Sequence, residues 1–297
     1  ISMKQPLFTG SGTALITPFH ADGSVNYEAF ERQLDFQLKN GTDALFVCVT
    51  TSETPTLTQD EYENLIRIAV DKSKGHVPVV AGAGSNSTAH SLELALCAQE
   101  IGAQAVLLVT PYYNKTSQAG LVRHFTYVAD RIDLPVLLYN VPSRTGCNIK
   151  PETYRELANH PRIAGTKEAN GDISAIAETI ALCGDDLPVF SGNDNQVIPI
   201  LALGGKGVVS VFSNILPRQM HDIAAGYLEG KQEQSLHEFL SWLDLMNALF
   251  YDVNPIPVKE AMNRMGMEAG PCRLPLTDMA PAAQEKLLAV LKRHSLI

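Results

Sequence analysis

Eight short runs of β-branched and aliphatic residues recur along the chain, and amphipathic stretches of helical length separate them. Such an alternation predicts right-handed βα crossovers and a parallel sheet. The runs lie at 12–17, 43–49, 77–81, 104–109, 135–140, 162–167, 187–191 and 206–211, and the helical patterns at 26–39, 58–73, 86–101, 117–131, 151–159, 171–183 and 194–203. Because eight βα units match a closed barrel better than an open sheet, we predict a (β/α)8 TIM barrel of the α/β class.

Helical patterns continue after the eighth run, at 214–229, 231–249 and 279–294, with no long linker before them. A chain of 297 residues is long enough for one large barrel and an appendage. We therefore expect a barrel over residues 1–230 and a C-terminal helical domain over residues 231–297.

Charge and composition exclude several classes of function. The formal net charge of −9, with Lys and Arg scattered, disfavours binding to nucleic acid or to a membrane surface. No apolar run approaches the roughly 18 to 20 residues of a membrane span, and no secretory signal is visible. Ile1 and Ser2 precede Met3 and are interpreted as an artificial remnant. The cysteines are odd in number and far apart, which favours a cytoplasmic location over a disulfide framework or a zinc site; they are Cys48, Cys97, Cys147, Cys183 and Cys272.

Polar residues gather where the predicted strands end, whereas the strand starts carry nothing comparable. In a TIM barrel the active site lies at the carboxyl ends of the strands, so these residues are expected to share one site. They lie at 50–53, 110–114, 139–144, 165–168 and 191–194. The aspartates of the chain do not pair with histidine at metal-ligand spacing, so no metal site is predicted.

Lys167 ends the sixth run. Period-two alternation places it on one face with Ile163 and Gly165, while Leu137 and Tyr139 share a face of the fifth run. If both faces point inward, the Tyr139 phenol and the Lys167 amine are neighbours that can exchange a proton. Desolvation in a barrel mouth lowers the pKa of an ammonium group and makes a lysine nucleophilic. The alternative is structural, with the amine at the rim and the phenol in the core.

Three other features also have two interpretations. Arg144 is either a surface charge or, held by a Pro-containing loop, a planar fork for a substrate carboxylate. Tyr112 and Tyr113 are either aromatic filler or part of the site. The glycine-rich segment 204–207 invites a phosphate-loop interpretation, but it precedes the eighth strand and so lies at the opposite end of the barrel. Tight packing of an entry turn explains it better.

Five motifs together resemble the dihydrodipicolinate synthase / N-acetylneuraminate lyase family of pyruvate-dependent class I aldolases, and most closely its dihydrodipicolinate synthase branch. The resemblance runs from 12–19 to 273–276, nearly end to end. The motifs are Tyr-Tyr-Asn-Lys at 112–115, Tyr-Asn-Val-Pro-Ser-Arg-Thr-Gly at 139–146, Lys-Glu-Ala at 167–169, Gly-Gly-Lys-Gly-Val-Val-Ser at 204–210 and Asn-Pro-Ile-Pro-Val-Lys at 254–259.

The resemblance implies a lyase that condenses pyruvate with L-aspartate 4-semialdehyde to 4-hydroxy-tetrahydrodipicolinate, on the route to diaminopimelate and lysine. It implies that Lys167 forms an imine with pyruvate and that Tyr139 shuttles protons, relayed through Thr50 and Tyr113. No cofactor is required, because the iminium is the electron sink. The family expectation is a homotetramer, a dimer of dimers, in which Tyr113 lies in the site of the neighbouring subunit.

The resemblance also implies the residues that bind substrate. Thr50 and Thr51 would hold the pyruvate carboxylate, and Arg144 would receive the carboxylate of the semialdehyde. The backbone near Gly192 and Val209 would line the pocket.

Two departures from the family pattern stand out. The family usually has Gly-Thr-Thr-Gly-Glu where this chain has Val-Thr-Thr-Ser-Glu at 49–53. Glycine permits positive φ and close backbone approach to a ligand, so we expect the loss of both glycines to reduce activity or shift substrate preference.

The second departure concerns the allosteric pocket that lysine-inhibited members carry at a dimer interface. Asn86 and Tyr112 match that pocket, Gln59 and Tyr62 replace histidines, and His90 replaces a glutamate. Because the lost carboxylate would pair with the ammonium of the effector, we predict weak or absent inhibition by lysine.

Two other functions remain open from the sequence. One is a related aldolase, such as N-acetylneuraminate lyase or a 2-keto-3-deoxy sugar-acid aldolase, with the same Lys167 chemistry and a different aldehyde. Arg144 argues against it, because sugar-acid members generally lack this Val-Pro-x-Arg arrangement. The other is a barrel that binds a keto acid without turnover, which the Val49 and Ser52 departures make conceivable.

Overall fold

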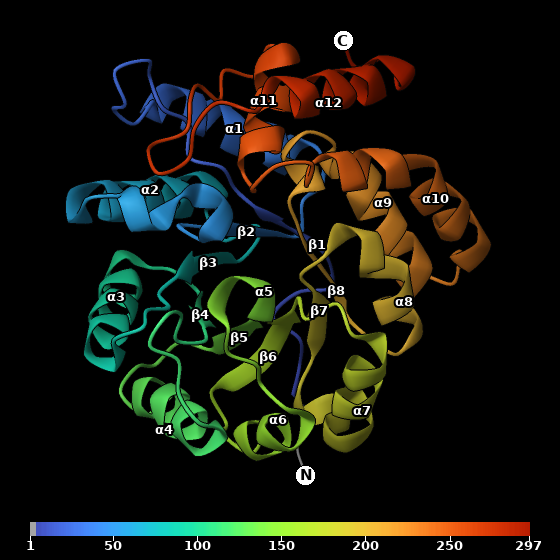
Figure 1. Ribbon diagram of the computed structural model, residues 1–297. Helices are drawn as coiled ribbons and strands as arrows, with labels where there is room; N and C mark the ends of the chain where they lie inside the picture. Colours follow the sequence, from blue (N-terminus) through green and yellow to red (C-terminus); the bar gives the residue numbers. More distant parts are fainter. Residues whose placement is uncertain (1–3) are drawn as a thin grey trace.

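Eight parallel strands form a closed barrel, paired in chain order from β1 to β8, with helices around the outside (Figure 1). The computed structural model describes residues 4–297, so Ile1 and Ser2 lie outside the described residues. The strands are β1 (Gly10–Ala14), β2 (Ala44–Val47), β3 (Val79–Gly82), β4 (Ala105–Val109), β5 (Val136–Asn140), β6 (Ile163–Glu168), β7 (Val189–Ser191) and β8 (Gly207–Ser210). The predicted TIM barrel is confirmed.

The helices follow the strands and continue beyond the last one. They are α1 (Tyr27–Lys39), α2 (Gln59–Ser73), α3 (Thr88–Ile101), α4 (Gln118–Ala129), α5 (Pro142–Thr145), α6 (Pro151–Leu157), α7 (Ile173–Cys183), α8 (Val197–Ala202), α9 (Pro217–Leu228), α10 (Gln232–Ala248), α11 (Ile256–Arg264) and α12 (Pro281–Arg293). Short 3₁₀ helices add η1 (Thr50–Ser52), η2 (Thr54–Thr56), η3 (Gly184–Asp186), η4 (Asp194–Gln196) and η5 (Phe212–Asn214). None of the helices within residues 4–297 has the length and apolar character to cross a membrane.

Some predicted boundaries are wrong for local reasons. The first strand ends at Ala14 and not at residue 17, because the chain leaves the barrel there and Phe19 forms an isolated antiparallel bridge with Val25. The helix predicted from residue 214 begins at Pro217, whose missing N–H suits the first turn. Helices α5 and α11 were not predicted.

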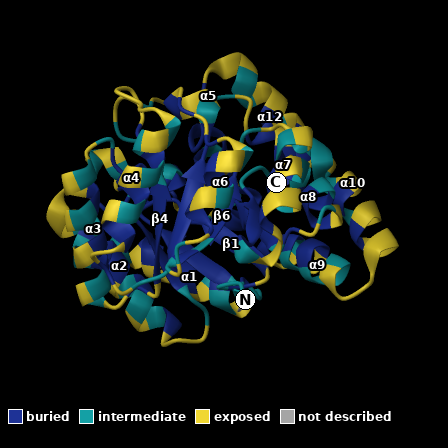
Figure 2. Cartoon of the chain, turned by 90° about the horizontal axis from the view of Figure 1, so that it is seen from below, coloured by how far each residue is buried: buried dark blue, intermediate teal, exposed yellow. Residues whose placement is uncertain are grey.

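The core has two layers around the barrel wall. One apolar cluster fills the interior, where Phe8 stacks on Phe190 with ring centroids 4.5 Å apart and so closes the amino-terminal end. The other joins the outer strand faces to the helices. Figure 2 shows the strands as buried and the outward faces of the helices as exposed. This double burial explains why most of the strands are continuous apolar runs.

The C-terminal helices share one apolar cluster with the barrel. Val258 and Met262 of α11 and Leu287 of α12 pack in the same cluster as Phe212 and Met220, which follow β8. The division at residue 230 stays a prediction, because this packing is continuous across it.

The glycine-rich turn before β8 serves packing. A Cβ on Gly205 would lie 2.8 Å from the carbonyl oxygen of Ile200, and one on Gly207 would overlap the backbone of Gly10 on β1. The turn lies where β8 begins, at the end of the barrel opposite the predicted site. This agrees with the packing interpretation of the segment.

Candidate active site

Lys167 and Tyr139 lie directly opposite each other on β6 and β5. Their side chains are only 4% and 6% exposed, and the Lys167 Nζ atom lies 4.1 Å from the centroid of the Tyr139 ring. The Lys167 amine and the Tyr139 side chain are therefore neighbours, as the strand pattern predicts. The nitrogen thus lies over the face of the ring.

The prediction that Ile163 shares the face of Lys167 is wrong. The register between β5 and β6 shifts by one residue, since Val136 pairs with Ile163 but Leu137 pairs with Gly165. Ile163 therefore packs in the cluster that faces the helices. After this β-bulge, Lys167 points into the barrel although Ile163, four residues earlier, points outward. A strict inward–outward alternation along the strand would place both side chains on the same face.

Gly192 lies beside the Lys167 side chain. A Cβ on Gly192 would lie 3.2 Å from Cγ of Lys167 and 2.8 Å from Cβ of Ala169, so a larger residue would press on the lysine stem. Val209 is 1% exposed and belongs to the interior cluster that contains Tyr139.

Asp194, the last of the polar residues that follow the seventh strand, carries a buried carboxyl group. Its Oδ2 atom accepts hydrogen bonds from the backbone N–H groups of Val211 and Phe212, at 3.1 and 3.0 Å. Its Oδ1 atom has no partner within residues 4–297. Burial raises the pKa of Asp194, while hydrogen bonds from Ser210 and from the backbone of Phe212 and Val211 oppose that effect, as does the more weakly acting charge of Lys167. The residue thus ties the segment after β8 to the lysine region.

Glu168 carries a second buried carboxyl group, on the opposite face of β6 from Lys167. Tyr154 donates its hydroxyl to Oε2 at 2.7 Å, and the Asn140 Nδ2 group donates to both oxygens at 3.1 and 3.2 Å. Burial raises the pKa of Glu168 to about 7, although these hydrogen bonds act in the opposite direction. This network fixes the strand that carries Lys167.

The 49–53 loop tolerates the residues that replace the family glycines. Val49 has φ −106° and ψ −171°, which is ordinary extended backbone. Ser52 ends η1, where its Oγ accepts the Val49 N–H at 3.0 Å and donates to the Leu15 carbonyl at 2.6 Å. The left-handed residue of the loop is Glu53, with φ 57°. Neither Val49 nor Ser52 therefore needs the positive φ that glycine permits.

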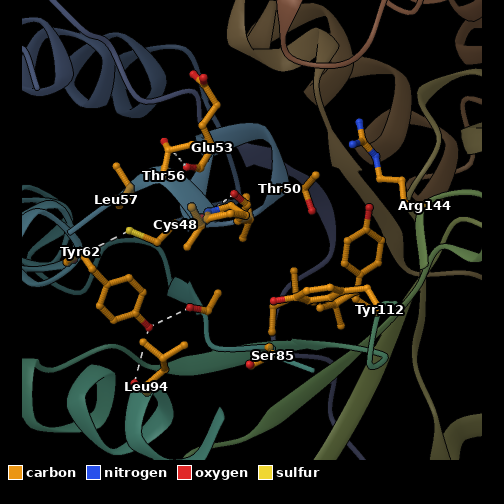
Figure 3. A pocket seen from close by; sticks show the side chains of 18 of the residues that line it. Cys48, Thr50, Glu53, Thr56, Leu57, Tyr62, Ser85, Leu94, Tyr112 and Arg144 are labelled. Carbon is orange, nitrogen blue, oxygen red and sulfur yellow. Dashed lines mark hydrogen bonds between the residues drawn. The ribbon is translucent and has the colours of Figure 1, made fainter. Parts of the chain in front are cut away.

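A cavity of about 710 Å³ opens at the carboxyl ends of the strands. Thr50, Tyr139 and Arg144 line it together with Tyr62 and Tyr112, and Figure 3 shows Tyr62 and Arg144 on opposite sides of it. Lys167 lies next to this cavity, behind the Tyr139 ring, and is not part of its lining.

Asn254, in the turn before helix α11, forms hydrogen bonds to both Arg144 and Thr51. Arg144 is on the one-turn helix α5, which Pro142 begins, and its Nη2 group donates to the carbonyl of Asn254 at 3.1 Å. The Asn254 Nδ2 group donates to Oγ1 of Thr51 at 2.9 Å. Arg144 thus lines the cavity, and it is carried by a helical turn and not by a loop.

Tyr113 lies outside the cavity of its own chain. Its side chain is 90% exposed, and its φ of 73° places a non-glycine residue in the left-handed region. Such backbone strain is concentrated at functional sites. The structure does not bring Tyr113 together with Lys167 within one chain.

The predicted allosteric residues are divided between two hollows. Gln59, Tyr62, His90 and Tyr112 line the same cavity as Thr50 and Tyr139. The Tyr62 hydroxyl already donates to the Gly82 carbonyl at 2.7 Å. Asn86 instead lines a second hollow of about 540 Å³.

Within residues 4–297, no group of three or more His, Cys, Asp or Glu side chains is placed to hold a metal ion.

Comparisons with known proteins agree with this geometry. Residues 7–294 match the model of the dihydrodipicolinate synthetase family. The 4-hydroxy-tetrahydrodipicolinate synthase of Acetivibrio thermocellus is 50% identical over 295 residues, which are 99% of this chain and 100% of that protein. The dihydrodipicolinate synthase structure from Thermotoga maritima has a TM-score of 0.95 at 44% identity and covers 98% of this chain and 100% of its own. The chloride-inhibited dihydrodipicolinate synthase from Acinetobacter baumannii, complexed with pyruvate, has a TM-score of 0.95 at 36% identity. The match covers 97% of this chain and 99% of that protein. The chain belongs to the dihydrodipicolinate synthetase family.

Proposed function

We propose that the protein is a 4-hydroxy-tetrahydrodipicolinate synthase, a lyase that condenses pyruvate with L-aspartate 4-semialdehyde through a Schiff base on Lys167. The observation that carries this proposal is the buried Lys167 amine against the Tyr139 ring, beside a cavity at the carboxyl ends of the barrel strands. Relatives that are about half identical over nearly their whole length bear the same name. The pyruvate complex of the Acinetobacter baumannii relative supports pyruvate as one substrate.

In the proposed reaction the Lys167 amine adds to the ketone carbon of pyruvate, and water leaves to give an iminium. Loss of a methyl proton produces an enamine, which attacks the aldehyde carbon of the semialdehyde while the aldehyde oxygen takes up a proton. The substrate amine then displaces Lys167 as the ring closes. The iminium serves as the electron sink, so the proposal includes no cofactor.

Tyr139 is the proposed proton shuttle, because its phenol shares the interior of the barrel with the amine. Thr50 lines the cavity beside it and is proposed to relay the proton. Tyr113 is proposed to complete the relay from a neighbouring subunit of a homotetramer in the cytoplasm. Its large exposed ring and left-handed backbone support a role outside its own chain.

Two carboxylate sites complete the proposal. Thr50 and Thr51, in the turn that follows β2, are proposed to hold the pyruvate carboxylate. Arg144 is proposed to receive the carboxylate of the semialdehyde, since a guanidinium at the cavity edge suits a planar anion. The backbone at Gly192 and Val209 is proposed to line the pyruvate site.

A coupled assay with pyruvate and L-aspartate 4-semialdehyde tests the function, run beside cleavage of N-acetylneuraminate and of a 2-keto-3-deoxy sugar acid. The proposal expects turnover with the semialdehyde and a kcat/KM at least about a hundredfold lower for the sugar acids, because Arg144 is placed for a second carboxylate. Turnover of a sugar acid alone would contradict the proposal. A pyruvate adduct without turnover would favour a keto-acid-binding barrel instead.

A further inference from the structure

Lys259 and Glu53 form a buried ion pair between the C-terminal segment and the turn that follows β2. The Lys259 Nζ atom lies 2.6 Å from Oε2 of Glu53, and the two side chains are 2% and 1% exposed. The ammonium also donates to the Pro271 carbonyl at 3.0 Å and lies 4.2 Å from the centroid of the Phe19 ring. The other oxygen of Glu53 accepts the backbone N–H of Arg273 at 2.9 Å.

The pair acts on the residue that closes the turn. Glu53 caps η1, the 3₁₀ helix of Thr50–Ser52, in a left-handed conformation with φ 57°. Such a conformation is unfavourable for a residue with a Cβ, and surrounding contacts must maintain it. Figure 3 shows the Glu53 carboxylate directed away from Thr50. The Lys259 ammonium and the Arg273 N–H therefore fix the direction of the Glu53 carboxylate.

Burial of two charges is a poor way to attach α11 to the barrel. Desolvation offsets the attraction of such a pair, and burial accordingly lowers the pKa of Lys259 while Glu53 opposes the shift. The apolar residues Val258, Ala261 and Met262 already bury α11 in the cluster shared with the barrel. The buried charges of Lys259 and Glu53 are better explained by a need to fix the geometry of the Thr50–Ser52 turn.

We infer that Lys259 is a positioning residue for the pyruvate subsite, acting through Glu53 on the Thr50–Ser52 turn. This inference rests on the proposed function, because it takes that turn as the site of the pyruvate carboxylate. The nearby hydrogen bond from Asn254 to Thr51 also helps to fix the position of this turn. Without Lys259, Glu53 loses the ionic contact that maintains its left-handed conformation, and the Thr50–Ser52 turn that it caps can move.

The test compares Lys259→Met with the double variant Glu53→Gln/Lys259→Met, which leaves no unpaired buried charge. Lys286→Met is the matched control, because Lys286 is exposed on α12. Steady-state kinetics with each substrate varied in turn are measured beside the melting temperature. Both Lys259 variants are expected to raise the pyruvate KM about tenfold, while the semialdehyde KM changes less than about twofold. The control is expected to match the wild type.

Each other outcome overturns a specific claim. If the variants lose kcat but keep the wild-type pyruvate KM, the pair supports only the folded state and the inference fails. It also fails if both Lys259 variants are insoluble while Lys286→Met is soluble, or if recovery of the melting temperature in the double variant brings recovery of the pyruvate KM. An inactive wild type would instead contradict the proposed function, and this inference with it.

Discussion

Tyr139 and Lys167 face each other inside the barrel because the register between β5 and β6 shifts by one residue before Leu137. The shift directs Ile163 outward and Lys167 inward. The phenol and the amine thus meet at the carboxyl end of two adjacent strands. A nucleophile and a proton shuttle need this proximity.

Tyr139→Phe keeps the ring that contacts Lys167 and removes only the hydroxyl. We expect kcat to fall about 10² to 10⁴-fold, as for the loss of a general acid or base, with a smaller change in pyruvate KM. Tyr127→Phe is the control, because Tyr127 is 41% exposed on α4. A wild-type kcat in Tyr139→Phe would remove this tyrosine from the mechanism.

Glu168 should make stability depend on pH. Its folded-state pKa is about 7 against an ordinary value of 4.5, so between these values the folded chain binds more protons than the unfolded chain. The free energy of unfolding therefore falls as pH rises through this window, by at most about 3 kcal/mol.

Glu168→Gln removes this contribution. Urea unfolding from pH 4.5 to 8, at one protein concentration, should show that the wild type loses stability relative to Glu168→Gln as pH rises. The control is Glu156→Gln, since Glu156 is exposed on α6. Parallel pH profiles for the wild type and Glu168→Gln would refute the buried-carboxyl account.

The 49–53 loop should not improve when its family glycines are restored. Neither Val49 nor Ser52 has positive φ, so Val49→Gly and Ser52→Gly should leave the pyruvate KM no lower and kcat no higher. Ser52→Gly should also cost about 1 to 2 kcal/mol of stability, because it loses both hydrogen bonds of the hydroxyl. Ser52→Ala separates that loss from the flexibility of glycine. A clear gain in pyruvate affinity with either glycine would show that the loop is impaired.

Lysine should inhibit weakly or not at all. His90 lines the cavity. By the family resemblance it replaces a glutamate, and we expect an imidazole to bind the effector ammonium less well than a carboxylate. His90→Glu should lower the half-inhibitory lysine concentration about fivefold or more. His76→Glu makes the same change at an exposed position away from the cavity and should have no effect. Strong inhibition of the wild type would overturn this assignment.

The barrel was predictable because most strands are apolar on both faces, and strand tips could be recognised by their polar residues. Helix α11 was missed, since the prolines at 255 and 257 mask its short apolar face. Helix α5 is a single turn and leaves no periodic signal. The shift between β5 and β6 was also missed, although Gly165, an isolated glycine within the sixth run, stands where the register changes and is the kind of residue that marks a bulge.

Motifs identified Lys167, Tyr139 and Arg144, but they do not reveal which charges are buried together. Glu53 and Lys259 are 206 residues apart in the chain, and only the folded structure shows their contact. Glu168 follows Lys167 directly, yet its burial beneath Tyr154 depends on α6 packing against the outer face of the barrel.

Borohydride reduction in the presence of pyruvate, followed by peptide mass spectrometry, tests the central claim most directly. Lys167→Met should form no adduct and show no turnover, whereas the wild type should carry a single pyruvate-derived adduct on Lys167. Lys259 is the internal control, because it is also a buried amine but is paired with Glu53. An adduct on Lys259 or any other lysine, or turnover by Lys167→Met, would contradict the account.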